Sequence, residues 1–270
     1  MTNIAGYGIA PAPIRLKGVQ PMTVKPRLSG SRRKRYGLAA VIVLALAGAC
    51  TYGVTRAPER VNVLASDGAP SISVMDFSVS MALDPPPPGW WHRTFWTRRA
   101  ATYSLAVKDG VAALRVETDN SASMLQRFVD IDLAAYPLLT WRWLVEKPID
   151  SAVDERSDDG DDHPARLFIA FRNGAGERRA LEIIWGNRLL KRGDVKFRGS
   201  FPHYVANGGT ENIGRWHAEQ VDLLALFKRF WPNDKPGRVT VVAVFCDSDE
   251  TGTSSVSYFA DIRLGRATQR

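Results

Sequence analysis

The chain has 270 residues, with 36 Lys and Arg against 28 Asp and Glu and a formal net charge of +8. The excess is local, because residues 1–60 contain ten basic residues and one acid, and the rest of the chain is close to neutral. This distribution excludes a nucleic-acid-binding role for the larger part of the chain. It indicates that the basic segment lies near anionic lipid.

The basic segment leads directly into an apolar run. Residues 32–35 are four consecutive cations, and residues 37–55 are uncharged and rich in Ala, Val and Leu. A helix over 37–55 would span roughly 28 Å at about 1.5 Å per residue, close to the hydrocarbon thickness of a bilayer. Because Lys and Arg stay on the cytoplasmic side, we expect a disordered cytoplasmic tail over 1–36 and a transmembrane signal anchor over 37–55. The chain would then cross the inner membrane once, with its C-terminal domain in the periplasm.

Cys50 leaves the mode of attachment open. Small residues precede it in the run Ala47-Gly48-Ala49-Cys50, as they precede the lipidated cysteine of lipoproteins. The same segment is compatible with an uncleaved anchor, with a lipoprotein lipidated at Cys50, or with an ordinary cleaved signal.

Beyond a linker expected over 56–75, residues 76–265 have the pattern of a β-sandwich domain. Short segments alternate apolar and polar residues, which is typical of strands with one buried face. The expected strands cover residues 105–107, 112–116, 139–145, 167–171, 181–185, 240–246 and 258–264. Many short strands at this spacing predict an all-β fold, a jelly-roll-type β-sandwich.

One segment has a helical period instead. Between Leu223 and Trp231 the apolar residues recur at intervals of three and four, Asp222 can cap the start, and Pro232 follows the end. We expect one amphipathic helix that covers an end of the sandwich.

Two sets of acids are candidate calcium ligands. Asp247 and Asp249 directly follow an apolar strand, and Asp76 and Asp261 stand in the first and last parts of the domain. Jelly rolls often bring their first and last strands together, and calcium takes six to eight oxygen ligands. The alternative for each set is a solvated acidic turn.

A second group of residues predicts a polar ligand site. Arg142 and Arg166 stand opposite the apolar stripes of their strands, and Asp161, Asp162 and His163 lie in an acidic loop between them. We expect both arginines to reach the Asp161–Asp162 pair, because the guanidinium fork suits carboxylates. The resulting patch would suit an acidic or polyhydroxylated ligand, whereas a purely structural salt bridge is the alternative.

Tryptophans supply possible sugar-stacking surfaces. Trp90 and Trp91 follow a four-proline run and point to opposite faces, so one of them can be exposed. Trp141 and Trp143 share a strand face with apolar neighbours and are expected in the core.

Several runs resemble a known bacterial family, the one described as domain of unknown function 3047. The runs are Ser121-Ala122-Ser123, Tyr136-Pro137-Leu138-Leu139-Thr140-Trp141-Arg142-Trp143, Gly160-Asp161-Asp162 with Pro164-Ala165-Arg166, Asp247-Ser248-Asp249 with Thr251-Gly252, and Tyr258-Phe259-Ala260-Asp261-Ile262. The resemblance implies an exported protein and supplies no catalytic residues. The closing strand is also similar to the last strand of carbohydrate-binding jelly rolls.

These observations favour a non-catalytic binding module for an envelope glycan or similar polar ligand. One alternative is a glycan-active hydrolase or lyase that uses paired carboxylates near Asp161, Asp162 and Glu182. Another is a structural envelope protein. Beyond a possible calcium ion, no cofactor is expected.

Overall fold

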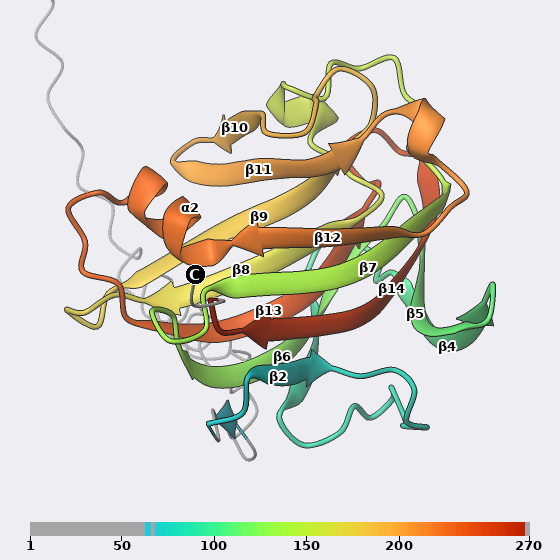
Figure 1. Ribbon diagram of the computed structural model, residues 1–270. Coiled ribbons are helices and arrows are strands. Elements are labelled where there is room, and N and C mark those ends of the chain that lie inside the picture. Colours follow the sequence, from blue (N-terminus) through green and yellow to red (C-terminus); the bar gives the residue numbers. More distant parts are fainter. Residues whose placement is uncertain (1–62, 66–67, 268–270) are drawn as a thin grey trace, which may run out of the picture. The chain divides into compact units, whose positions relative to one another are not determined.

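The computed structural model describes residues 63–65 and 68–267. Within these residues the chain folds into two β-sheets, of eight and six strands, that face each other (Figure 1). The prediction of an all-β sandwich is therefore confirmed. No helix in the described part is both long and apolar enough to cross a membrane, and the expected anchor over 37–55, with Cys50, lies outside that part.

The eight-stranded sheet contains the strands whose charged side chains form the candidate site. Its order is β1-β6-β13-β8-β9-β11-β10, with β3 also paired to β6. Most neighbours are antiparallel, but β1 runs parallel to β6 and β11 runs parallel to β9. The strands are β1 (Leu64–Ala65), β3 (Trp90–Thr94), β6 (Ala122–Asp132), β8 (Arg166–Arg172), β9 (Arg178–Gly186), β10 (Val195–Arg198), β11 (Phe201–Gly208) and β13 (Arg238–Asp247).

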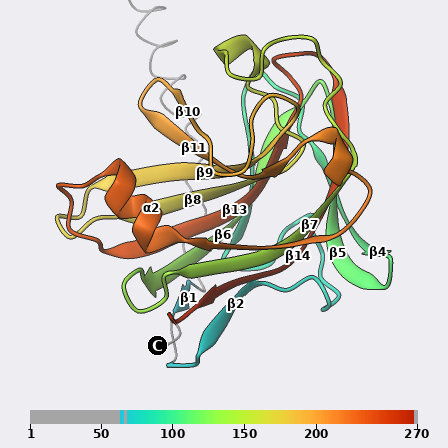
Figure 2. The ribbon, with the colours of Figure 1, turned by 45° about the horizontal axis from the view of Figure 1, so that its top comes forward.

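The six-stranded sheet contains the closing strand of the domain. Its order is β12-β7-β14-β5-β4, and β2 also pairs with β14. In both views β4 and β5 lie side by side at one edge of this sheet (Figure 2), and the strand order places β12 at the opposite edge. The strands are β2 (Ser71–Met75), β4 (Thr102–Lys108), β5 (Val111–Asp119), β7 (Leu138–Lys147), β12 (His217–Asp222) and β14 (Ser254–Gly265).

The N-terminal boundary of the sandwich lies earlier than the sequence indicated. Both β1 and β2 fall within residues 56–75, which we expected to be a linker. β2 pairs with β14, with Met75 opposite Ile262. The first and last parts of the domain therefore adjoin, as predicted.

Aromatic side chains join the two sheets. Trp141 and Trp143 of β7 are fully buried, as expected, and the ring of Trp143 lies 5.7 Å from that of Trp185 on β9. Burying a large apolar side chain contributes roughly 1.5–3 kcal/mol. These contacts fix how the two sheets stack.

The predicted amphipathic helix is α2 (Leu223–Phe230), which follows β12. The Asp222 carboxylate accepts a hydrogen bond from the Ala225 amide at 2.9 Å, the N-cap that the sequence indicated. Leu223, Leu226 and Phe227 are buried. Two short 3₁₀ turns, Asp158–Gly160 and Thr210–Asn212, complete the helical elements of the described residues.

Candidate functional site

A pocket of about 340 Å³ opens on the outer face of the eight-stranded sheet. Successive residues of a strand point to opposite faces, and Leu167, Ile183 and Val244 point into the core between the sheets. Their neighbours in the chain therefore line the opposite face. The pocket walls are Phe95, Thr97, Arg98, Ala122, Asp161, Arg166, Glu182, Arg198, Phe201, His203, Phe245, Asp247, Asp249 and Glu250.

A row of charged side chains crosses five adjacent strands at this pocket. Strand pairing sets Glu182 opposite His203 and His203 opposite Lys196. On the other side, Arg166 is opposite Phe245, two residues before Asp247, and opposite Ile184, two residues after Glu182. The row runs in the order Asp247, Arg166, Glu182, His203 and Lys196, and the Arg166 side chain reaches Glu182 diagonally across the two strands.

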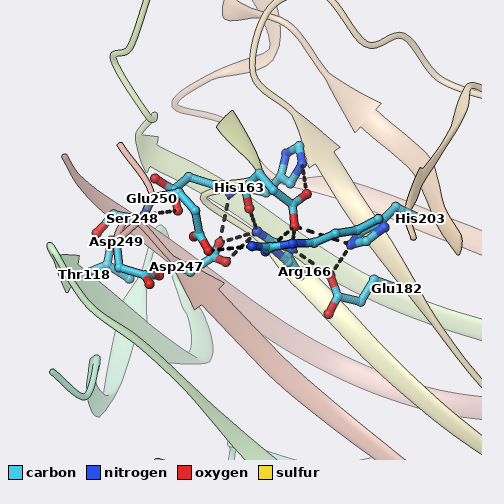
Figure 3. A network of polar contacts seen from close by, with 12 residues as sticks. Thr118, His163, Arg166, Glu182, His203, Asp247, Ser248, Asp249 and Glu250 are labelled. Carbon is cyan, nitrogen blue, oxygen red and sulfur yellow. Dashed lines mark hydrogen bonds and ion pairs between the residues drawn. The ribbon is translucent and has the colours of Figure 1, made fainter. Parts of the chain in front are cut away.

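Arg166 contacts several carboxylates of this site (Figure 3). Its Nη1 donates to Glu182 Oε2 at 2.8 Å, and its Nη2 donates to Asp247 Oδ1 and Oδ2 at 2.6 and 2.5 Å. Nη1 also lies 3.6 Å from Asp161 Oδ2, and the guanidinium lies over the Phe245 ring, 4.9 Å from its centroid. The guanidinium is fully buried, and such charge-assisted bonds satisfy carboxylates that would otherwise be unpaired.

Asp161 is surrounded by cations. Its Oδ1 lies 2.5 Å from Lys196 Nζ, and its Oδ2 accepts from Arg198 Nη1 at 3.0 Å. Burial alone would raise the pKa of Asp161, but the positive charge of Arg166 holds it well below its usual range. Asp161 is therefore a fixed carboxylate in this pocket.

His163 and Asp162 lie immediately behind the pocket wall. His163 Nδ1 is 2.9 Å from the Trp185 carbonyl oxygen, which makes Nδ1 the donor and leaves Nε2 to face Lys196 Nζ at 3.4 Å. Burial lowers the pKa of His163 to about 4, so the ring is neutral at neutral pH. Asp162 accepts from the Thr251 amide and hydroxyl at 2.6 and 2.5 Å. Both residues shape the loops around the pocket.

Acids and arginines alternate at the pocket mouth. Arg98 Nε lies 2.8 Å from Asp249 Oδ2, and Arg198 Nη2 donates to Glu250 Oε1 at 3.1 Å. Burial raises the pKa of Glu250 to about 7, and the Asp162 and Asp249 carboxylates add to the effect. Glu250 is thus a wall residue whose charge changes near neutral pH, and burial also raises the pKa of the Asp247 carboxyl well above its usual range.

Four carboxylates at this end of the pocket have geometry compatible with a metal ion. Oxygens of Asp162, Asp247, Asp249 and Glu250 all lie within 4.8 Å of one another. All four already accept from protein donors: Asp162 from Thr251, Asp247 from Arg166, Asp249 from Arg98, and Glu250 Oε1 from Arg198. Asp247 and Asp249 are therefore brought together as the calcium prediction required, and the ion itself stays a prediction.

The second predicted calcium pair has protein partners of its own. Asp76 accepts from the Ser78 amide at 2.9 Å, and Asp261 accepts from Arg142 Nε at 2.6 Å. Asp76 directly follows β2, and Asp261 is on β14, which pairs with β2, but a cation from the protein already neutralises Asp261. A shared calcium ion at this pair also stays a prediction.

The prediction that Arg142 reaches the Asp161–Asp162 pair is wrong. Arg142 is on β7 of the six-stranded sheet and pairs with Asp261, whereas Arg166 is on β8 of the other sheet. Arg166 does reach Asp161, but the Asp162 oxygens are bonded to Thr251 and the Glu250 amide. Outward-facing arginines on similar strands thus end on different faces of the sandwich.

Trp90 and Trp91 lie outside the pocket as well. Trp90 packs on Phe77, with ring centroids 6.2 Å apart, and Trp91 stacks on Phe128 at 6.4 Å. A different tryptophan stands near the pocket. Trp96, between the wall residues Phe95 and Thr97, is 97% exposed.

Sequence reasoning did not single out the wall residues Arg98, Arg198 and His203, or Lys196 directly behind the wall. Lys196 and Arg198 alternate with apolar residues in β10, but this strand is only four residues long. His203 reaches the site through the parallel pairing of β11 with β9. A four-residue strand and a parallel pairing between distant strands produce no pattern in the local sequence from which these residues could be predicted.

The fold and site define an all-β sandwich protein with a buried charged row beneath a surface pocket. The chain belongs to the family described as "Protein of unknown function (DUF3047)", which matches residues 88–263. Two of the five runs that carry the resemblance, Gly160–Arg166 and Asp247–Gly252, meet at this pocket. A search of curated proteins found no match.

Solved structures with a similar fold have low sequence identity. A family 11 carbohydrate-binding module of a cellulosomal cellulase of Clostridium thermocellum is 10% identical, with a TM-score of 0.40 over 74% of this chain and 96% of that one. A family 30 carbohydrate-binding module of the same organism is 11% identical, with a TM-score of 0.42 over 74% and 99%. The xyloglucanase domain of a type three effector from Sinorhizobium fredii is 11% identical, with a TM-score of 0.38 over 66% and 93%.

Proposed function

We propose that the pocket on the eight-stranded sheet binds a hydroxyl-rich ligand, an envelope glycan, without chemical conversion. The observation that carries the proposal is the row of fixed charges beneath a pocket of about 340 Å³ with three Phe rings in its walls. That volume is within the range of small-ligand sites.

The wall chemistry matches the surface of a sugar. Hydroxyl groups both donate and accept, so they can bond to carboxylates such as Asp249 and to guanidinium groups such as Arg198. Phe95 and Phe201 offer apolar surfaces for the C–H faces of the ring. Because ion pairs already hold the polar groups in place, binding needs little rearrangement of the walls.

The state of the carboxylates favours binding over hydrolysis. A glycosidase needs one carboxyl group that donates a proton and a second that attacks or activates water. Asp161, Glu182 and Asp247 are held by Arg166, which lies within 3.6 Å of all three. Carboxylates fixed by a cation are poor nucleophiles, so these three residues do not supply the attacking group. Glu250, whose pKa is about 7, does have the raised pKa of a proton donor, so hydrolysis is the alternative to exclude by assay.

A glycan array with the full-length protein tests the proposal. The pocket variant Arg198→Ala should lower binding at least tenfold, because it removes an arginine at the mouth. Arg142→Ala is the matched control: it removes an arginine of similar exposure that pairs with an aspartate on the other sheet. If the protein binds no glycan on the array, or if both variants lose the same amount of glycan binding, the proposal is contradicted. A shortened glycan recovered after incubation with the protein would favour the hydrolase.

We further propose that the sandwich, of jelly-roll type, is tethered to the inner membrane and faces the periplasm. The support is the sequence alone, with four cations before an uncharged run over 37–55. A reporter fused after Arg270 should be active only as a periplasmic enzyme, and cytoplasmic activity would reverse the topology. Cys50→Ser should leave the mature mass and membrane association unchanged if the helix is the anchor, whereas loss of a lipid-sized mass would identify a lipoprotein.

A further inference from the structure

The pocket holds more carboxylates than cations. Its walls include five acids and three arginines. Asp162 and Lys196, directly behind the walls, add one charge of each sign. His163 is neutral, and even with His203 counted as a cation the acids remain in excess. The wall acids are Asp161, Glu182, Asp247, Asp249 and Glu250, and the wall arginines are Arg98, Arg166 and Arg198.

The wall acid that is least compensated by a cation is Glu250. The inner acids are paired, since Asp161 lies against Lys196, and Arg166 holds Glu182 and Asp247. Glu250 Oε1 shares Arg198 with Asp161, and its Oε2 is buried with no hydrogen-bond partner among the described residues. One oxygen of this carboxylate therefore lacks a hydrogen-bond donor, while the other lies 3.1 Å from Arg198 and 4.0 Å from Arg98.

The surroundings of Glu250 are acidic. Oxygens of Asp162, Asp247 and Asp249 lie within 4.8 Å of its carboxylate. This crowding contributes to the raised pKa of Glu250, about 7, for which burial is the main cause. A cation placed at Glu250 would relieve both the burial and the repulsion.

We propose, on the basis of the ligand pocket proposed above, that the ligand is a glycan with free amino groups, whose ammonium binds Glu250. An ammonium group carries one positive charge and three donors. It supplies the donor that Glu250 Oε2 lacks, while the sugar hydroxyls meet the remaining walls.

An ammonium group suits the unpaired Glu250 oxygen better than a metal ion does. Calcium requires six to eight oxygens, but Asp162, Asp247 and Asp249 already accept from Thr251, Arg166 and Arg98. The free acceptor in this group is Glu250 Oε2, which suits a single N–H donor.

Calorimetric titration of the full-length protein with matched oligosaccharides tests the inference. The probes are the β-1,4-linked tetramers of glucosamine, of N-acetylglucosamine and of glucose. We expect the glucosamine tetramer to bind at least tenfold more tightly than the other two. Glu250→Gln should reduce this preference, taken as the ratio of the glucosamine to the glucose tetramer affinity within the same variant, to about twofold or less.

Glu146→Gln is the matched control, because Glu146 is a partly exposed, ion-paired acid on the other sheet, and it should keep the full preference. Thermal melts of each variant verify folding. Equal affinities for the three tetramers would overturn the inference and leave glycan binding intact. Binding of none of these tetramers and of no glycan on the array would overturn the proposed function itself. A rise in melting temperature with calcium that Glu250→Gln abolishes would assign Glu250 to a metal instead of an amine.

Discussion

Replacing Arg166 with Met should destabilise the domain more than any other single substitution in the pocket. Met retains much of the side-chain volume and removes the charge. Three carboxylates that contact the guanidinium, Asp161, Glu182 and Asp247, would lose their shared cation inside the protein. Removing one partner of a buried ion pair costs about 3–5 kcal/mol, because the remaining charge is left uncompensated.

That loss is a large fraction of the stability of a domain, which is about 5–15 kcal/mol in total. For a domain of this size each kcal/mol shifts the melting temperature by about 2–4 °C, so the variant should melt roughly 6–20 °C lower. The loss should also depend on pH. Arg166 holds the pKa values of Asp161 and Glu182 below their ordinary values, against the effect of burial. A lowered pKa stabilises the fold above the ordinary carboxyl pKa, and this contribution is lost as the pH falls through the folded-state value.

Calorimetric melts of the full-length wild type and variant from pH 7 down to pH 3 measure both effects. The difference in melting temperature should be greatest near pH 7 and should shrink toward acid. Arg142→Met is the matched control, because the Arg142–Asp261 pair is partly exposed, and such pairs contribute at most about 1 kcal/mol. If Arg166→Met melts within about 2 °C of the wild type, or if its deficit grows toward acid, the buried charged row does not exist as described.

Three further predictions concern single residues. Trp96→Ala should leave the melting temperature unchanged, because the side chain is 97% exposed, and should lower glycan affinity about two- to tenfold if the ring stacks on a sugar; titration and melts separate the two effects. Glu155 accepts from the backbone amides of Arg188 and Leu190 at 2.9 and 2.8 Å, so Glu155→Gln should cost about 1.5–3 kcal/mol in a urea titration. Burial acts to raise the pKa of Glu155, but the hydrogen bonds from these amides lower it overall. The destabilisation caused by Glu155→Gln should therefore be full near pH 7 and should decline as the pH falls below about 4. Asp222→Ala removes the α2 cap and should cost about 1 kcal/mol, and a loss above about 3 kcal/mol would mean that Asp222 has another role.

The strands that could be predicted from the sequence are those with one uninterrupted apolar face. β7, β8, β9, β13 and β14 all contain such a stripe, because their inward residues pack only against the other sheet. β6 was missed, although it lies centrally in its sheet. The face of β6 that holds Leu125 and Val129 also holds Arg127 between them, and the Arg127 guanidinium lies over the Trp90 ring of β3. A polar residue with a partner from a distant strand interrupts the stripe, so periodicity cannot find the strand.

The site was predictable in part for a similar reason. Asp161 and Arg166 are close in the chain, and their charges suggested a pair that the structure contains. Arg142 has the same outward position on its strand, but strand order decides which sheet it joins, and that order depends on long-range pairing. The partners of Arg166 from β9 and β13 come from positions 16 and 81 residues further along the chain.

The two runs that lie in the family match also hold each other in place. Asp162 accepts from the backbone amide of Thr251, and Asp247 accepts from the backbone amide of His163. Each run thus supplies a carboxylate that orders the backbone of the other, and Arg166 links Asp161 to Asp247 between them. The second run leads from β13 of one sheet to β14 of the other, so this reciprocal contact ties the pocket to the junction of the two sheets. A pocket anchored in this way is ordered before the ligand arrives, so the free-energy cost of ordering the protein during the proposed binding would be small.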